Sequence, residues 1–284
     1  MNFPSKWRET VDPYQLKYKN FLLIEVLGYP HAGNDVFFAR GIYRKEEKLV
    51  FIKVGRQKNA DIKNEVEILN QLSLNYVPKI IDYDEQMMFR VSIALEGERL
   101  STIVGENNHL ESLDYLDTYG KALAEIHCIK GKFHSVKDRR FFHVPPREYF
   151  EENHIDLFIY DYLENNKPKE KSLCFCHGDF HYANILWKDK QISGILDWEL
   201  AGIGIREFDI AWAIIVRPSQ KFLKEKVETK KFIQGYQSIT KCNEDYIKYY
   251  EILIYVWFYQ LGEEAYKAFV LKKIKQYLNQ VCEE

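Results

Sequence analysis

The first hundred residues carry short apolar runs separated by glycine and charged residues. The segments 21–28, 36–44 and 48–55 are rich in β-branched and aromatic residues, and such runs are typical of strands. Two further runs, 79–84 and 87–95, have the same character. The N-terminal third of the chain is therefore predicted to be rich in strands.

Helical spacing interrupts these strands once and then dominates the rest of the chain. Ile62, Val66, Leu69 and Leu72 recur at helical intervals, and a second helical pattern begins near Asp114. The segment 191–199 reads as a short strand that ends in acids, and the chain beyond about residue 205 is mostly helical in pattern. The apolar run 250–262 predicts a buried helix, because a bilayer span needs about 20 apolar residues.

The change of pattern near residues 95–100 divides the chain. A length of 284 residues suits two domains or two lobes. We predict an N-terminal lobe over 1–95 and a C-terminal lobe over 96–284, with a cleft between them.

Composition excludes several classes of protein. The formal net charge is −2, so no basic excess is present for a nucleic-acid backbone. Five cysteines do not form a disulfide framework in a chain of this length, and they indicate reduced thiols in the cytoplasm. The polar N-terminus carries no apolar signal core. A cytoplasmic protein without nucleic-acid or membrane partners is expected.

The stretch "LCFCHGDFHYANILW" (173–187) concentrates polar chemistry between two apolar runs. One interpretation is a zinc site, but Cys174 and Cys176 stand as C-x-C, whereas structural zinc sites usually use C-x₂₋₄-C pairs. A two-metal phosphatase needs later histidine ligands, and no histidine follows His181. An ordinary polar turn is the third interpretation.

A phosphoryl-transfer loop explains the spacing better. His177, Asp179 and Asn184 match H-x-D-x-x-x-x-N, in which an acid accepts the hydroxyl proton and an amide reaches Mg²⁺. Asp197 follows after 13 residues, at the end of an apolar strand, where a second Mg²⁺ ligand belongs. The simpler interpretation, that Asp197 only begins a turn, is less favoured in this context.

A nucleotide site also needs a lysine and an acid that holds it. Lys53 lies on the strand-like segment 48–55. Glu65 and Glu67 compete as its partner. Glu65 shares the apolar helix face and Glu67 points away, so Glu65 is predicted to pair with Lys53.

The loop between the first two predicted strands is a candidate cover for phosphates. Gly28, Gly33 and Asn34 tolerate positive φ, which lets backbone N–H groups turn toward an anion. The loop is not G-x-G-x-x-G, and a hairpin turn is its plainer interpretation.

Together these segments resemble the aminoglycoside phosphotransferase and choline-kinase-like family. "CHGDFHYANILW", "GILDWE" and "REFDIAW" look like three consecutive C-lobe motifs of that family, and "FIKVG", "NEVEILNQL" and "YVPKII" look like its N-lobe motifs. The resemblance implies an α+β, two-lobed protein-kinase-like fold. Its N-terminal lobe would be an antiparallel sheet plus one helix, and its C-terminal lobe mostly helical.

The resemblance also implies roles for individual residues. Asp179 would be the catalytic base, and Asn184 and Asp197 would bind Mg²⁺. Lys53, held by Glu65, would contact the phosphates of ATP or GTP. His177 would be a packed histidine of the catalytic loop, and Asp209 would brace that loop. Glu199 would help to order the metal site. The connection from Ile93 to Leu95 would bind the adenine. The usual Gly-Asp-Pro after the metal-binding acid is replaced by "GIGIREFD".

The acceptor remains open at this point. Family members phosphorylate hydroxyls of small molecules, and an aminoglycoside-type or other antibiotic is the leading expectation. A metabolic kinase for choline or ethanolamine, homoserine or a sugar is the alternative, and an inactive nucleotide-binding scaffold is the third. The acids in the C-terminal helices could bind a cation, and aromatic residues near Trp257 could line a pocket or simply pack. A monomer is expected.

Overall fold

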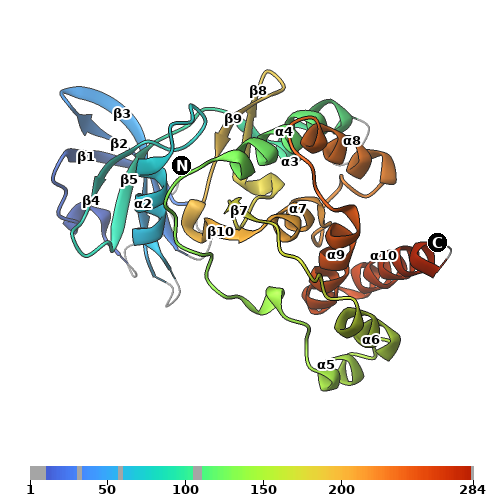
Figure 1. The fold of residues 1–284 in the computed structure, drawn as a ribbon. Coiled ribbons are helices and arrows are strands. Elements are labelled where there is room, and N and C mark those ends of the chain that lie inside the picture. Colours follow the sequence, from blue (N-terminus) through green and yellow to red (C-terminus); the bar gives the residue numbers. More distant parts are fainter. Residues whose placement is uncertain (1–10, 31–33, 57–59, 105–110, 283–284) are drawn as a thin grey trace. The chain divides into compact units, whose positions relative to one another are not determined.

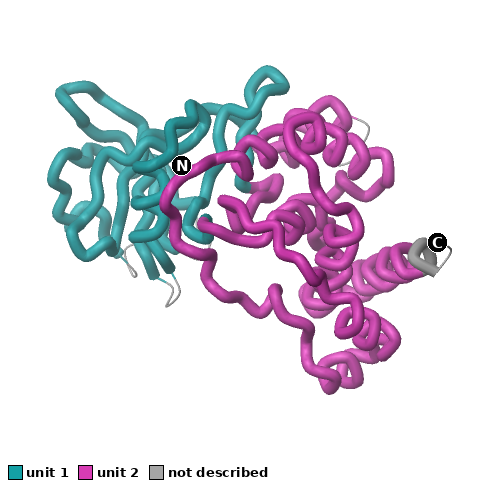
Figure 2. The backbone as a smooth tube through the Cα atoms, in the orientation of Figure 1, with its two compact units in different colours: residues 1–98, 184–201 teal, residues 99–183, 202–284 magenta. Residues whose placement is uncertain are grey.

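The computed structural model describes residues 11–30, 34–56, 60–104 and 111–282. The chain forms two compact units (Figure 2). Unit 1 comprises residues 1–98 and 184–201, and unit 2 comprises residues 99–183 and 202–284. The predicted boundary after residue 95 thus lies three residues before the first change of unit. The prediction did not assign residues 184–201 to the N-terminal part.

Unit 1 is built on an antiparallel five-stranded sheet of order β1-β2-β3-β5-β4 (Figure 1). Its strands are β1 (Phe21–Gly28), β2 (Asp35–Tyr43), β3 (Glu46–Val54), β4 (Ile80–Tyr83) and β5 (Phe89–Ile93). Each was predicted from its apolar run. One face packs into a core that includes Phe37, Val50, Ile52 and Val91, all fully buried.

Among the described residues, one α-helix, α2 (Ile62–Gln71), belongs to unit 1 together with this sheet. Asp61 caps it by accepting a hydrogen bond from the backbone N–H of Asn64, which satisfies one free donor of the first turn. Ile62, Val66 and Leu69 are buried as their spacing predicts, and Glu65 is buried beside them.

A hairpin of β8 (Ile185–Lys188) and β9 (Gln191–Ile195) also belongs to unit 1. The two strands pair antiparallel, with Ile185 opposite Ile195, and Asp189 and Lys190 form the turn with positive φ. The hairpin brings Asn184 and Leu196 together at its open end, where the Leu196 N–H donates to the Asn184 carbonyl at 2.8 Å. The 13-residue interval between Asn184 and Asp197 is therefore one hairpin. β6 (Glu98–Arg99) lies at the change of unit.

Unit 2 is mostly helical, as predicted (Figure 1). Its helices are α3 (Leu100–Ile103), α4 (Leu113–Cys128), α5 (Arg147–Glu152), α6 (Leu157–Asn165), α7 (Arg206–Ile214), α8 (Lys226–Gln237), α9 (Glu244–Phe258) and α10 (Glu264–Cys282). A two-stranded sheet of β7 (Leu173–Cys176) and β10 (Gly202–Ile205) leads into the polar stretch. The apolar run 250–262 provides most of the buried face of α9.

Glycines allow α4 and α8 to pack closely. A Cβ on Gly120 would lie 2.0 Å from the Phe232 carbonyl oxygen, and one on Gly235 would lie 2.1 Å from the Asp117 carbonyl oxygen. Side chains at these two positions would force the helices apart, so backbone contact fixes this pair. Within the described part of the chain, no helix is long and apolar enough to cross a membrane.

Candidate functional site

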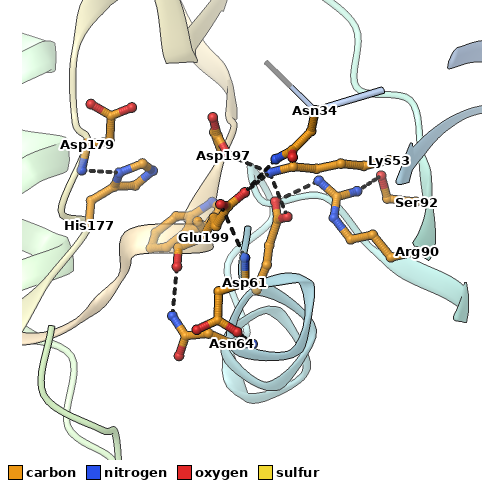
Figure 3. A network of polar contacts seen from close by, with 12 residues as sticks. Asn34, Lys53, Asp61, Asn64, Arg90, Ser92, His177, Asp179, Asp197 and Glu199 are labelled. Atoms are coloured by element: carbon orange, nitrogen blue, oxygen red, sulfur yellow. Dashed lines mark hydrogen bonds and ion pairs between the residues drawn. The ribbon is translucent and has the colours of Figure 1, made fainter. Parts of the chain in front are cut away.

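The ammonium group of Lys53 is the centre of a buried charge network in unit 1 (Figure 3). β3 carries Lys53 on its inward side, where the side chain is only 7% exposed. Its Nζ lies 2.7 Å from Asp197 Oδ1, 2.7 Å from Glu199 Oε2 and 3.0 Å from Glu65 Oε2. Burial alone lowers the pKa of Lys53, but the carboxylates of Glu65 and Asp197 outweigh it and raise the pKa above its ordinary value. Lys53 therefore remains charged.

Glu65 is the predicted partner of Lys53, and the structure confirms the pairing. Its second oxygen, Oε1, lies 2.6 Å from Arg90 Nη2, and Arg90 also donates to Ser92 Oγ at 2.9 Å. Burial raises the pKa of Glu65, yet Arg90 and Lys53 lower it to about 2. Glu67, by contrast, is 39% exposed and faces Lys63 at 3.8 Å.

Asp197 lies two residues beyond β9, in the left-handed region at φ 63°. A non-glycine residue in this region is uncommon, and aspartate tolerates it better than most. The side chain is 46% exposed even though it contacts Lys53. Asn184 lies at the same open end of the hairpin, so an amide and a carboxylate, the oxygen donors that Mg²⁺ prefers, come from one end of one element.

Glu199 is held in place from three directions. Its carboxylate accepts from Asn34 Nδ2 at 3.0 Å and from the Asp61 backbone N–H at 3.2 Å. Asn64 on α2 donates from Nδ2 to the Glu199 carbonyl at 2.9 Å and to the Ala201 carbonyl at 3.0 Å. The segment after β9 is thereby fixed to the N-terminus of α2.

The loop before β2 is described at its two ends. Gly28 ends β1 and does not have positive φ. Asn34 contributes its side-chain amide to Glu199. Gly33 lies outside the described residues. Ile93 ends β5 and Leu95 follows in the connecting segment, both partly exposed; the Ala94 N–H donates to the Leu49 carbonyl at 2.9 Å.

The polar stretch of unit 2 is organised by Asp209 on α7. Its two carboxylate oxygens accept the backbone N–H groups of His177 and Gly178, each at 3.0 Å. These bonds are the brace that the family resemblance implies. His177 is fully buried, and its Nδ1 accepts the Asp179 N–H at 3.2 Å, so it is a packed member of the loop (Figure 3).

Asp179 presents its carboxylate at the end of this braced loop. Trp212 Nε1 donates to its Oδ1 at 2.7 Å, and His181 Nε2 lies 3.6 Å from its Oδ2. Burial raises the pKa of Asp179, but the neighbouring His181 ring and the charge of Arg217 lower it to about 2. The side chain remains 22% exposed. The carboxylate of Asp179 is thus ionised at neutral pH and partly accessible.

His127 on α4 is a residue that the sequence reasoning missed. It is buried, with Nδ1 2.7 Å from the Tyr236 hydroxyl and Nε2 3.1 Å from Asp209 Oδ2. Burial lowers the pKa of His127, but hydrogen bonding to Asp209 and Cys174 raises it to about 9. The ring therefore supports Asp209, which binds the backbone of the loop at His177 and Gly178. The helical pattern around His127 is consistent with a buried position, but only spatial proximity reveals the contact.

The positions of Cys174 and Cys176 do not fit the zinc site considered from the sequence. Cys174 Sγ and Cys176 Sγ are 3.7 Å apart and buried, and they gather with His127 rather than with His177 and His181. Both ring nitrogens of His127 already contact other groups. The described cysteines Cys128, Cys174, Cys176 and Cys242 are free thiols.

Lys53 occupies the centre of the carboxylate cluster of unit 1. Glu65, Asp197 and Glu199 offer carboxylate oxygens within 4.8 Å of one another. Three carboxylates stand against two cations, Lys53 and Arg90, which leaves one negative charge in the network. Asp197, at 46% exposed, is the most accessible of the three carboxylates, and with Asn184 it offers the oxygen donors that Mg²⁺ prefers.

Comparisons with known proteins found a matching family and curated relatives. The profile of the family described as "Phosphotransferase enzyme family" matches residues 32–240. The chain is 28% identical over 149 residues to an aminoglycoside 3'-phosphotransferase of Enterococcus faecalis, covering 52% of this chain and 47% of that protein. It is 27% identical to one of Staphylococcus aureus over the same length. The matched part thus spans about half the length of these curated relatives.

Solved structures share the fold at low identity. The streptomycin–ATP–APH(2")-IIa complex superimposes with a TM-score of 0.59 at 18% identity, covering 89% of this chain and 91% of that one. Choline kinase LicA from Streptococcus pneumoniae gives 0.57 at 14% identity, covering 95% of both. The predicted α+β, protein-kinase-like fold is confirmed.

Proposed function

Because the chain belongs to the phosphotransferase enzyme family, we propose that it transfers the γ-phosphate of ATP or GTP to a hydroxyl group of a small molecule in a Mg²⁺-dependent reaction. The observation that carries the proposal is the buried Lys53 ammonium among Glu65, Asp197 and Glu199. A charged lysine held by an acid, beside further carboxylates, is the arrangement that phosphoryl transfer needs.

In this proposal unit 1 binds the nucleotide. Lys53 contacts the phosphates, and Glu65 holds its ammonium group in place. Asn184 and Asp197 would hold Mg²⁺, with Glu199 ordering their surroundings. Bound Mg²⁺ would neutralise charge on the β- and γ-phosphates. The segment from Ile93 to Leu95 contacts the adenine, and the loop with Gly33 and Asn34 covers the phosphates.

Asp179 of unit 2 serves as the base. The acceptor oxygen forms a bond to the γ-phosphorus, and the bond from that phosphorus to the β–γ bridging oxygen breaks. The nucleoside diphosphate leaves with that electron pair, and the hydroxyl proton passes to Asp179. His177 and Asp209 act as positioning residues, since they fix the loop backbone around Asp179.

The curated relatives are named for aminoglycosides, so an aminoglycoside-type or other antibiotic is one candidate acceptor. A metabolic acceptor, such as choline or ethanolamine, homoserine or a sugar, is the other, because a choline kinase shares the fold. The intact set of Lys53, Asp179 and Asp197 argues against an inactive scaffold. A cytoplasmic monomer remains our prediction.

The test is a nucleotide-consumption assay with ATP and GTP against a panel of hydroxyl compounds. Asp179→Asn should reduce kcat by roughly 10²–10⁴ and leave the nucleotide Kd unchanged, because a base acts mainly in the transition state. Asp161→Asn, at an exposed position of α6, is the matched control and should behave as the parent. Turnover of Asp179→Asn near that of the parent would refute the base assignment.

A further inference from the structure

The carboxylate of Asp179 borders a cluster of aromatic rings and guanidinium groups in unit 2. Trp212, whose Nε1 donates to Asp179, belongs to this cluster. We call the set the aromatic–guanidinium cluster; its members are Arg139, Arg140, Phe141, Trp212, Arg217, Trp257 and Phe258.

The rings form one continuous group around Phe141. Its centroid lies 5.2 Å from that of Trp212, 5.8 Å from that of Phe258 and 6.3 Å from that of Trp257. Trp212 and Phe258 also meet at 5.5 Å. Phe141 and Trp257 remain partly exposed, so part of this aromatic surface can be reached from solvent.

Three guanidinium groups lie over these rings. Arg139 is 5.2 Å from the Trp212 centroid, and Arg217 is 5.3 Å from it. Arg140 is 5.0 Å from the Phe141 centroid and 5.2 Å from that of Trp257. Arg217 also donates to the carbonyls of Ile215 and Trp212, which fixes its position. Such stacked arginines retain N–H donors at the plane edge for an anion.

The chain around Arg139 and Arg140 is basic as well. The segment 130–147 contains six lysines and arginines and one acid, Asp138. Asp138 contacts His143 Nε2 at 2.7 Å. This segment is anchored on β10, where the Val136 N–H donates to the Ile203 carbonyl at 3.0 Å. A short helical turn (Arg140–Phe142) then places the arginines and Phe141 against α7 and α9.

A polycationic acceptor needs a carboxylate-lined surface, whereas positive potential beside the reacting group disfavours its approach. From the aromatic–guanidinium cluster we infer that the acceptor is a flat, apolar hydroxyl compound carrying a negative charge, such as a carboxylate, and not a polycation. The inference rests on the proposed function and names the substrate class of the same site. The apolar part of the acceptor would contact the exposed parts of Phe141 and Trp257, and its anionic group would bind Arg140, whose guanidinium lies over both rings.

Three probes that share a benzyl alcohol group and carry a negative charge, no charge or a positive charge test this inference. They are 4-(hydroxymethyl)benzoate, benzyl alcohol and 4-(aminomethyl)benzyl alcohol. Binding to the full chain, measured by calorimetry with the nucleotide present, should rank carboxylate above neutral above ammonium. Each step should be roughly tenfold in Kd, as expected for one charge-assisted hydrogen bond. An inverted or flat ranking, or no binding of any probe, would overturn the inference.

A pair of variants locates the effect. Arg140→Gln should weaken binding of the carboxylate probe about tenfold and leave that of the neutral probe within twofold. Arg147→Gln removes the same charge from an exposed position on α5 and should leave all three probes unaffected. Equal effects of the two substitutions would show that only net charge matters, and would overturn the assignment of Arg140.

Acceptor-independent nucleotide hydrolysis separates this inference from the proposed function. If the protein hydrolyses nucleotide in a manner that requires Asp197 but prefers the ammonium probe, the phosphotransferase proposal stands and the acceptor class is wrong. If no nucleotide is bound or hydrolysed at all, the proposed function fails, and with it the inference that rests on it.

Discussion

Replacing Glu65 with alanine tests the charge network of unit 1 at its most buried point. The Glu65 side chain is fully buried and contacts Lys53 at 3.0 Å and Arg90 at 2.6 Å. Its removal leaves two buried cations without their common counter-charge. We expect Glu65→Ala to reduce the free energy of unfolding by about 3–5 kcal/mol, the usual cost of breaking a buried pair from one side.

The pKa of Glu65 gives an independent magnitude. A fall from 4.5 to about 2 is about 2.5 pKa units, which corresponds to about 3 kcal/mol of differential stabilisation of the charged form. Because the folded-state pKa is depressed, this contribution is present above the unfolded-state pKa of 4.5. It is lost as the pH falls through about 2. The difference between parent and Glu65→Gln should therefore shrink as the pH falls from about 5 to about 3.

Glu67→Ala is the matched control on the same helix. Its carboxylate is 39% exposed and 3.8 Å from Lys63, and such i,i+4 surface pairs contribute about 0.3–0.5 kcal/mol. Urea unfolding followed by tryptophan fluorescence suits the measurement, since Trp187 and Trp198 are buried within unit 1. Equal losses for Glu65→Ala and Glu67→Ala, or a loss below about 1 kcal/mol at Glu65, would refute the reasoning.

The same variants report on nucleotide use. Glu65→Ala and Lys53→Ala should each lower kcat/KM for the nucleotide, and the double variant should lose less than the sum in free energy. The residues share one network, so removing either leaves the other misplaced. Strictly additive losses would indicate that Lys53 and Glu65 act separately.

Two further predictions concern Asp197 and Glu251. Asp197→Asn is the suitable variant because asparagine also tolerates left-handed φ. It should abolish the Mg²⁺-dependent part of nucleotide binding, measured by a calorimetric metal titration. An unchanged titration would show that Asp197 is only a turn residue. Burial raises the pKa of Glu251 on α9 to about 7, and the hydrogen bond from Tyr277 opposes this rise. The stability that protonated Glu251 contributes is therefore present below pH 4.5 and is lost as the pH rises through 7. Glu251→Gln should remove this decline, worth about 3 kcal/mol, from urea unfolding between about pH 5 and pH 8, whereas the exposed Glu264→Gln should keep it.

The elements that could be predicted from sequence are those determined by residues close to one another along the chain. Alternating apolar runs specify β1 to β5, and the helical face of α2 indicates that Glu65, not Glu67, turns inward. The open end of the β8–β9 hairpin follows from chain spacing, which brings Asn184 close to the segment that carries Asp197. In each case neighbours close along the chain decide the outcome.

Contacts across long separations could not be predicted. Arg90 shares the carboxylate of Glu65 from a strand 25 residues away, and an arginine in a strand pattern reads as solvent-facing. His127 reaches Asp209 across 82 residues, and nothing in its own helix indicates which buried partner it has. Arg139 and Arg140 read as surface charge until the structure places them over the rings of Trp212 and Trp257.

The low pKa of Asp179 bears on how the proposed base acts. A carboxylate with a pKa of about 2 is too weak to remove a hydroxyl proton in advance of phosphoryl transfer. In a loose transition state the acceptor oxygen becomes acidic only as its bond to phosphorus forms, and a weak base that is always ionised can then accept the proton. Position consequently matters more than basicity. The bonds from Asp209 to the loop backbone and from Trp212 to Asp179 supply that position, which explains why so many buried polar groups are committed to one partly exposed carboxylate.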